Sequence, residues 1–180
     1  MYKINIPESE YYDEQTERFI NVKAQTICVE HSLVSISKWE SKWKKPFIND
    51  NEKPIEEIRD YIRCMTLTQN VDPNVYDCLS MDVIKGVLEY IEDPMTATTF
   101  SNNKKEAKKG EFVTSELVYY WMTALNIPME CQKWHFNRLM TLIRIAGEKN
   151  QPPKKMSKNE ILSRNKALNA QRRAKLRSKG

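Results

Sequence analysis

Two short pairs of side chains in this sequence have the types and spacing of metal ligands. Cys28 and His31 are separated by two residues and Cys131 and His135 by three, so the pairs use both histidines of the chain. Cysteine and histidine at such spacings bind zinc. However, Cys131 and His135 also fall on the apolar face of an expected helix, and Cys28 falls on an expected strand. Buried cysteines and a hydrogen-bonded histidine explain the pairs equally well. We expect no metal and no cofactor, although the sequence leaves open whether the four side chains converge.

Candidate catalytic groups are scarce. Nucleophilic catalysis needs a base beside the nucleophile, and the chain has only two histidines. Ser32, next to His31, is better explained as the residue that caps a helix. No G-x-S-x-G, dinucleotide-binding or P-loop motif occurs, and four glycines are few for a protein that cradles phosphates. We therefore expect the protein not to be an enzyme.

Charge is distributed unevenly along the chain. Residues 151–180 contain ten Lys and Arg against one acid, Glu160, a net charge of +9. The 19 basic and 23 acidic residues of 1–150 give −4. A basic tail docks on acidic partners or follows nucleic-acid phosphates, but this one has no aromatic side chain to stack on bases. The candidate partner-binding cations are Lys154, Lys155, Arg164, Lys166, Arg172, Arg173, Lys175 and Arg177.

The apolar pattern at the N-terminus predicts a small β-sheet. Apolar and polar residues alternate over 2–6 and again over 18–32, with an acidic loop between them, so the two stretches suit a pair of strands. A second pair of strands is expected from residues 95–100 and 112–114, on either side of a polar loop.

Helices are predicted over most of the remaining body. Ser32 caps an expected helix over about 33–45, in which Ile36, Trp39 and Trp43 form an inward apolar stripe. Further helical segments are expected after Pro54, Asp72 and Ser80.

The most apolar part of the chain is a pair of segments, 115–126 and 129–150, joined by a short break. We expect them to pack as an antiparallel helical hairpin that forms the main core. A capping box at Ser157 and Glu160 then starts a helix in the tail. The predicted fold class is α+β and predominantly α-helical, with a globular body over 1–150 and a basic helical tail over 151–180.

Three longer stretches carry specific strings. They are EHSLVSISKWESKWKKPF (30–47), TSELVYYWMTALNIPMECQKWHFNRLMTLIRI (114–145) and PPKKMSKNEILSRNKALNAQRR (152–173). They resemble tail assembly chaperones encoded in the tail-module region of long-tailed bacteriophages. The Trp-rich first block and the run W-M-x-x-L-N-I-P-x-E-C-Q-K-W-H are the most specific parts. None of them is a catalytic motif, so the resemblance implies a role and no active site.

The resemblance implies a mainly helical protein of the host cytoplasm that binds the phage tape measure protein. Such chaperones keep that protein soluble while major tail protein polymerises around it, and many also occur as a longer, frameshifted product. This role needs a groove or helical face with surplus apolar side chains, to which methionines supply adaptable contacts. The alternative is a small phage nucleic-acid-binding or regulatory protein that acts through the basic tail. The sequence has no apolar run long enough for a membrane span, and we expect no membrane partner.

Overall fold

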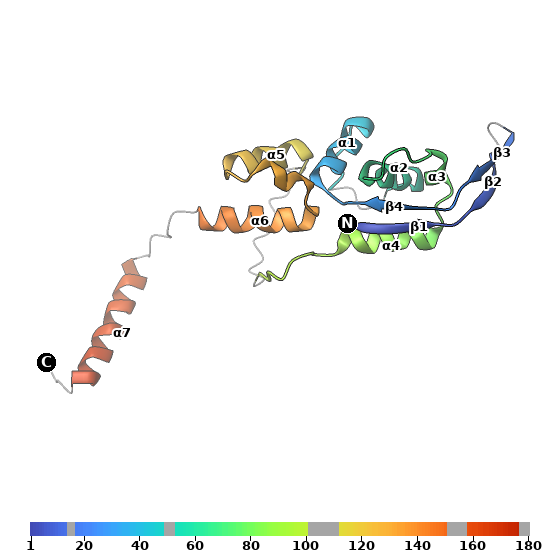
Figure 1. Ribbon diagram of the computed structural model, residues 1–180. Coiled ribbons are helices and arrows are strands. Elements are labelled where there is room, and N and C mark those ends of the chain that lie inside the picture. Colours follow the sequence, from blue (N-terminus) through green and yellow to red (C-terminus); the bar gives the residue numbers. More distant parts are fainter. Residues whose placement is uncertain (14–16, 49–52, 101–111, 151–157, 177–180) are drawn as a thin grey trace. The chain divides into compact units, whose positions relative to one another are not determined.

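The computed structural model describes residues 1–13, 17–48, 53–100, 112–150 and 158–176 (Figure 1). The chain divides into two compact units, Met1–Lys149 and Asn150–Gly180. The first unit combines short strands with helices and is predominantly helical, which confirms the predicted α+β class. Within the described residues, no helix is long and apolar enough to cross a bilayer.

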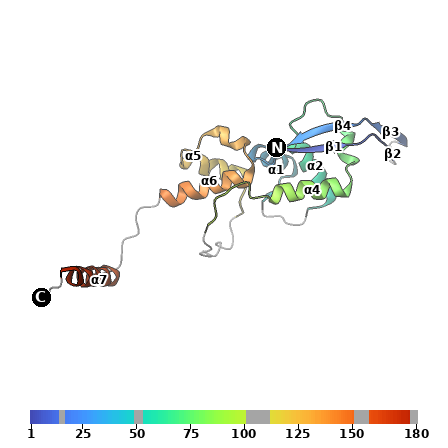
Figure 2. The ribbon, with the colours of Figure 1, turned by 60° about the horizontal axis from the view of Figure 1, so that its bottom comes forward.

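Four short strands form two antiparallel ladders at the N-terminus. β1 (Tyr2–Ile6) pairs with β4 (Gln25–Val29), and β2 (Ser9–Asp13) pairs with β3 (Arg18–Val22). The predicted pairing of the first strand with a later one is confirmed. Figures 1 and 2 show that the β2–β3 part of this ribbon extends away from the helices.

Two details of the strand prediction were wrong. Residues 9–13 form β2 rather than part of an acidic loop, because β3 provides cross-strand partners such as Phe19 opposite Tyr12. Their rings lie 5.1 Å apart, a contact typical of stable strand pairs. The single strand expected over 18–32 is instead divided into β3 and β4 at residues 23–24.

The inner face of the β1–β4 ladder is apolar and supports a helix. Ile4 and Ile27 are opposite each other and both are buried. At the start of β1, the ring of Tyr2 stacks on that of Tyr90, with centroids 5.3 Å apart. Gly86 makes this approach possible, since a Cβ there would lie only 2.7 Å from the Tyr2 hydroxyl.

α1 (Leu33–Trp43) begins at the predicted cap. The Ser32 hydroxyl accepts a hydrogen bond from the Ser35 backbone N–H, and the Ser35 hydroxyl accepts one from the Ser32 N–H, so both orphan donors are satisfied. Trp39 is fully buried, as predicted, whereas Trp43 is only half-buried. The helix ends at Lys44, which adopts the left-handed conformation with φ of 57°.

The other helices of the first unit lie close to their predicted places. They are α2 (Ile55–Met65), α3 (Asn74–Asp77), α4 (Met81–Glu92), α5 (Ser115–Ala124), the 3-10 helix η1 (Met129–Lys133) and α6 (Phe136–Lys149). Both views show α5 and α6 as neighbours (Figures 1 and 2). The segment expected as one helix over 129–150 is divided, because Trp134 is extended and separates η1 from α6.

The prediction of a second pair of strands was wrong. Residues 95–100 and 112–114 contain no strand in the structure. In the first stretch, Met95 and residues 97–99 are exposed, and in the second only Val113 packs against the core, so neither stretch presents a continuous apolar strand face. The threonines of residues 95–100 favour strands, but a strand forms only where its side chains pack against neighbours, and these do not.

The centre of the core lies where β4, α1 and α2 meet. Most of the largest fully buried side chains come from these three elements: Ile27, Val29, Leu33, Ile36, Trp39, Tyr61, Ile62 and Met65. α5 and α6 add Val118, Met122 and Leu139. The two most apolar segments of the sequence thus contribute to the core without being its centre.

In the second unit, the described residues 158–176 form a helix, α7 (Lys158–Leu176). All of its described side chains are exposed. The charged side chains and the few apolar side chains of α7 are therefore both exposed to solvent, and none of the described ones is buried.

Candidate partner-binding cleft

An open cleft of about 670 Å³ lies on the first unit, with walls from α2 and α4. Its apolar lining consists of Ile36, Phe47, Ile48, Ile58, Ile62, Leu88, Ile91 and Phe136. Its polar lining consists of His31, Lys53, Tyr61, Glu92 and Asn137. The volume lies within the range of ordinary ligand-binding sites, roughly 300–1,000 Å³. This is a largely apolar site with a few convergent polar groups.

Both helical walls of the cleft use the same spacing. α2 contributes Ile58, Tyr61 and Ile62, at positions i, i+3 and i+4, and α4 contributes Leu88, Ile91 and Glu92 at the same spacing. Residues so spaced lie on one face of a helix. Leu88 is 38% exposed, so apolar surface remains open to solvent at the α4 wall.

A buried carboxylate, that of Glu40, fixes the position of Phe47, which follows α1 and lines the cleft. Glu40 is only 7% exposed, and its two carboxylate oxygens accept hydrogen bonds from the backbone N–H groups of Phe47, at 2.8 Å, and Ser115, at 2.7 Å. The Phe47 ring packs 4.0 Å from that of Tyr61, between centroids. Glu40 therefore fixes an aromatic wall of the cleft and also favours the N-terminus of α5, which attracts negative charge.

The first residues of α6 close the cleft at another side. The Phe136 backbone N–H donates to the carbonyl of His31 at 2.7 Å. The Asn137 amide donates to the carbonyls of Ile91 and Asp93, at 2.9 and 2.8 Å. These bonds attach the start of α6 to the start of α1 and to the end of α4.

Two histidines meet beside the cleft in a buried aromatic cluster. The rings of His31 and His135 lie 5.1 Å apart in an edge-to-face arrangement. His31 Nδ1 shares a hydrogen bond of 2.5 Å with the Tyr61 hydroxyl. His135 Nε2 lies 3.0 Å from the Tyr90 carbonyl oxygen, while His135 Nδ1 is buried and has no hydrogen-bond partner in the described structure.

This environment favours the uncharged forms of its members. Burial, together with the neighbouring His135, lowers the pKa of His31 to about 3, and burial also lowers the pKa of His135. Burial raises the pKa of Tyr61 and that of Tyr90 well above the ordinary value. The cluster therefore consists of neutral imidazoles and phenols at neutral pH.

The two candidate metal-ligand pairs do not converge on one site. Within the described part of the chain, no group of three or more His, Cys, Asp or Glu side chains could hold a metal ion. His31 and His135 are adjacent, but Cys28 is half-buried in β4 and Cys131 is buried in η1, both as free thiols. The histidines instead help to join α1 to α6.

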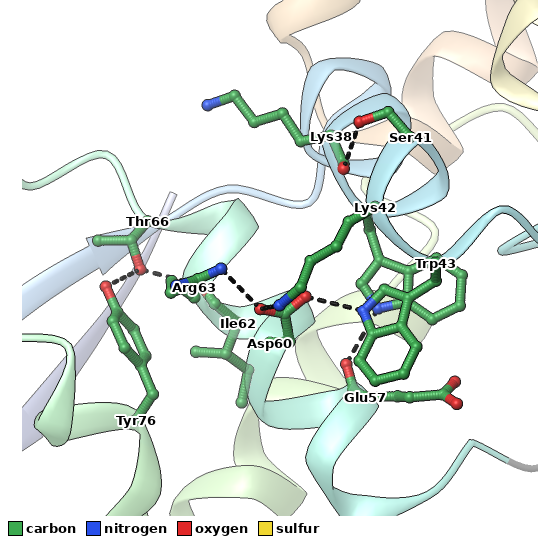
Figure 3. Close-up of polar contacts among 11 residues, drawn as sticks. Lys38, Ser41, Lys42, Trp43, Glu57, Asp60, Ile62, Arg63, Thr66 and Tyr76 are labelled. Atoms are coloured by element: carbon green, nitrogen blue, oxygen red, sulfur yellow. Dashed lines mark hydrogen bonds and ion pairs between the residues drawn. The ribbon is translucent and has the colours of Figure 1, made fainter.

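A second polar network attaches α1 to α2 on the outside of the body (Figure 3). Asp60 accepts hydrogen bonds from Lys42 Nζ at 2.6 Å and Trp43 Nε1 at 2.8 Å, and Arg63 lies 3.0 Å away. Burial alone would raise the pKa of Asp60, but the bonds from Lys42 and Trp43 lower it below the ordinary value. Trp43 therefore has a specific polar partner, which explains why it lies at the edge of the core.

The predicted cations of the tail form a separate candidate surface. The structure places Arg164, Lys166, Arg172, Arg173 and Lys175 on α7, where all are exposed. Lys154, Lys155 and Arg177 lie outside the described residues. None of these α7 cations lines the cleft, so charge is the feature that distinguishes this second surface.

Sequence reasoning did not find the cleft. Phe47 and Ile48 follow the proline at the end of the first predicted helix, and nothing in their spacing indicates a wall. For α2 and α4 the sequence predicts helices but not which apolar side chains stay accessible, and Leu88, which lines the cleft, is 38% exposed. The expected methionine contacts are not found there either, since Met65 and Met122 are buried in the core and no methionine lines the cleft.

Comparisons of the chain with models of protein families, with curated proteins and with solved structures gave no match.

Proposed function

We propose that the protein is a bacteriophage tail assembly chaperone, which binds a helical segment of the tape measure protein in the host cytoplasm. The three sequence stretches given above suggest this role. In this proposal the protein acts through protein–protein contacts alone, and its partners are the tape measure protein and, during tube growth, the major tail protein.

The observation that carries the proposal is the open apolar cleft between α2 and α4. An amphipathic helix is recognised when its apolar face enters a hydrophobic groove. The cleft offers eight apolar lining side chains and only a few polar ones. None of its lining residues belongs to a strand, so an added β-strand is a poorer match than a helix.

Co-expression with the tape measure protein tests the proposal. Leu88→Gln removes an apolar side chain from the cleft wall while keeping good helix propensity. Met81→Gln, at the other end of α4, is the matched control, since Met81 is 67% exposed and does not line the cleft. We expect the tape measure protein to co-purify with the wild type and the Met81 variant and to be reduced with the Leu88 variant. Absence of co-purification with the wild type would contradict the proposal.

The second candidate function is nucleic-acid binding through α7, which its exposed cations favour. Binding of this kind is independent of sequence and falls with salt. If about five phosphates are contacted, the log–log slope of affinity against salt is roughly −4 to −5. Retardation of any DNA at about 150 mM salt, lost when residues 151–180 are removed, would favour this function over the chaperone.

A further inference from the structure

The C-terminal end of α4 carries an excess of negative charge. Glu89, Glu92 and Asp93 are all exposed, and the last turn contains no basic residue. The C-terminus of a helix is the negative end of its dipole, where additional negative charge is unfavourable. Glu89 and Glu92 are also three positions apart on one helix, so the two carboxylates repel each other.

Among the described residues, these acids have no cationic partner on the protein. Neither Glu89 nor Glu92 forms an ion pair with any residue that the structure describes. Lys85, one turn earlier on α4, makes no ion pair with Glu89. The Asn137 amide donates to the last carbonyls of the helix but adds no positive charge. The charge at this helix end is therefore uncompensated.

The uncompensated charge adjoins the apolar wall of the cleft. Glu92 lines the cleft together with Leu88 and Ile91. Glu89 precedes Glu92 by three positions on α4; it is exposed to solvent and does not line the cleft. The cation of the opposite wall, Lys53, is already engaged, because its ammonium donates to the Phe47 carbonyl at 2.8 Å and lies 4.4 Å from the centre of the Phe47 ring. An incoming helix thus meets apolar side chains next to open carboxylates.

We infer that the cleft selects a cationic amphipathic helix of a partner protein. The apolar stripe of that helix packs against Ile58, Leu88 and Ile91, and its Lys or Arg side chains pair with Glu89 and Glu92. This inference rests on the proposed function, because it specifies the chemistry of the segment that the chaperone would bind. Binding would also relieve the repulsion at the end of α4.

Model peptides added to the full-length protein test the inference directly. The first is an amphipathic peptide of about 18 residues, roughly five helical turns, with Leu on one face and Lys on the flanks. The second replaces each Lys by Glu, and the third has the composition of the first in scrambled order. Glu89 and Glu92 attract the Lys side chains of the first peptide and repel the Glu side chains of the second, so the cationic peptide should bind about tenfold more tightly than the anionic one. The scrambled peptide should bind weakly, because it has no apolar stripe.

Charge reversal locates the preference on the protein. In the variant Glu89→Lys/Glu92→Lys the preference should be lost or inverted toward the anionic peptide. Glu8→Lys/Glu10→Lys changes the net charge equally at exposed positions outside the cleft and should leave the preference unchanged. Circular dichroism spectra and melting curves of both variants establish that they are folded.

Three results would overturn the inference: equal affinity for the cationic and anionic peptides, equal affinity for the scrambled peptide, or the same loss in both charge-reversed variants. Co-purification of the tape measure protein separates this inference from the proposed function. If that protein binds equally to the wild type and to Glu89→Lys/Glu92→Lys, the charge preference is wrong while the chaperone role stands. If the peptides behave as expected but the tape measure protein does not co-purify, the cleft takes such a helix from another partner.

Discussion

α1 and α7 are both helices, yet they are stabilised in different ways. α1 has 11 residues, five of which are buried: Leu33, Ser35, Ile36, Trp39 and Glu40. α7 has 19 residues, and all of its described side chains are exposed. Isolated helices of this length are marginal in water, so most of the stability of a helix comes from the face that it buries. The shorter helix should therefore dominate the free energy of unfolding.

The comparison also separates two kinds of candidate binding surface, the cleft and α7. Residues that line the cleft are held by a packed core and by bonds from buried groups such as Glu40, so the shape of the site is fixed before a partner arrives. α7 offers charge and a thin apolar stripe without such support. Changes in α1 should act on folding, and changes in α7 on association.

The largest effect is expected for Trp39→Ala. Trp39 is fully buried and its indole N–H donates to the Glu57 carbonyl at 3.1 Å, so the variant should lose about 3–5 kcal/mol in free energy of unfolding. Urea denaturation measures the loss. Leu168→Ala in α7 is the control and should change the free energy by less than about 0.5 kcal/mol. A Trp39 variant as stable as the control would mean that burial does not distinguish the two helices.

Glu40→Ala should cost somewhat less. It leaves the backbone N–H groups of Phe47 and Ser115 without their carboxylate acceptor, and each unsatisfied buried donor costs about 1–3 kcal/mol. Chemical denaturation should show a loss of about 2–4 kcal/mol. Glu40→Gln keeps one acceptor oxygen and should lie between the variant and the wild type. Equal stability of all three proteins would exclude Glu40 as the support of the cleft wall.

The buried histidines should make the first unit sensitive to acid. The pKa of His31 is about 3 in the folded protein and about 6.5 when unfolded, so the unfolded chain binds the extra proton first. The stability due to neutral His31 is complete above about pH 6.5 and is lost progressively as the pH falls toward 3. Between pH 6.5 and 5 the loss should be about 1–2 kcal/mol.

A variant that lacks His31 but keeps His135 isolates the contribution of His31. His31→Gln cannot titrate, so its free energy of unfolding should fall less steeply between pH 6.5 and 5 than that of the wild type. The slopes are compared rather than the absolute stabilities, because the substitution also alters the bond to Tyr61. Parallel slopes would show that His31 is not buried as a neutral imidazole.

The smallest effect on stability is expected for removal of residues 151–180. Since the described side chains of α7 bury nothing, the shortened chain should unfold within about 0.5 kcal/mol of the full chain. Co-purification of the tape measure protein should nevertheless decrease, because the tail cations are lost. A large fall in melting temperature would show that the tail contributes to the core.

Local signals made the helices predictable. Ser32 and Ser80 have side chains that cap the next helix, and the stripe through Ile36 and Trp39 has helical spacing, so α1 and α4 are found where the sequence places them. β2 could not be found in this way, because its acidic composition hid a strand that depends on its pairing with β3. For residues 95–100, strand propensity indicated an element that no packing supports.

The candidate site was much less predictable than the fold. The contact between His31 and His135 joins residues about a hundred positions apart, and no local pattern indicates which distant residues meet. The cleft depends on such contacts as well, because its walls come from α1, α2, α4 and α6. Only the tail cations, which are concentrated in the last 30 residues, could be proposed as a surface from the sequence alone.

The bridge between Ser32 and His135 has a consequence for the order of folding. The β1–β4 ladder and the α1–α2 pair join residues close in sequence, so they form early, whereas this bridge must close a loop of about a hundred residues. During synthesis the bridge cannot form until α6 has left the ribosome. Phe136 and Asn137 complete the cleft at that same moment. The candidate cleft is therefore complete only after nearly all of the first unit has been made.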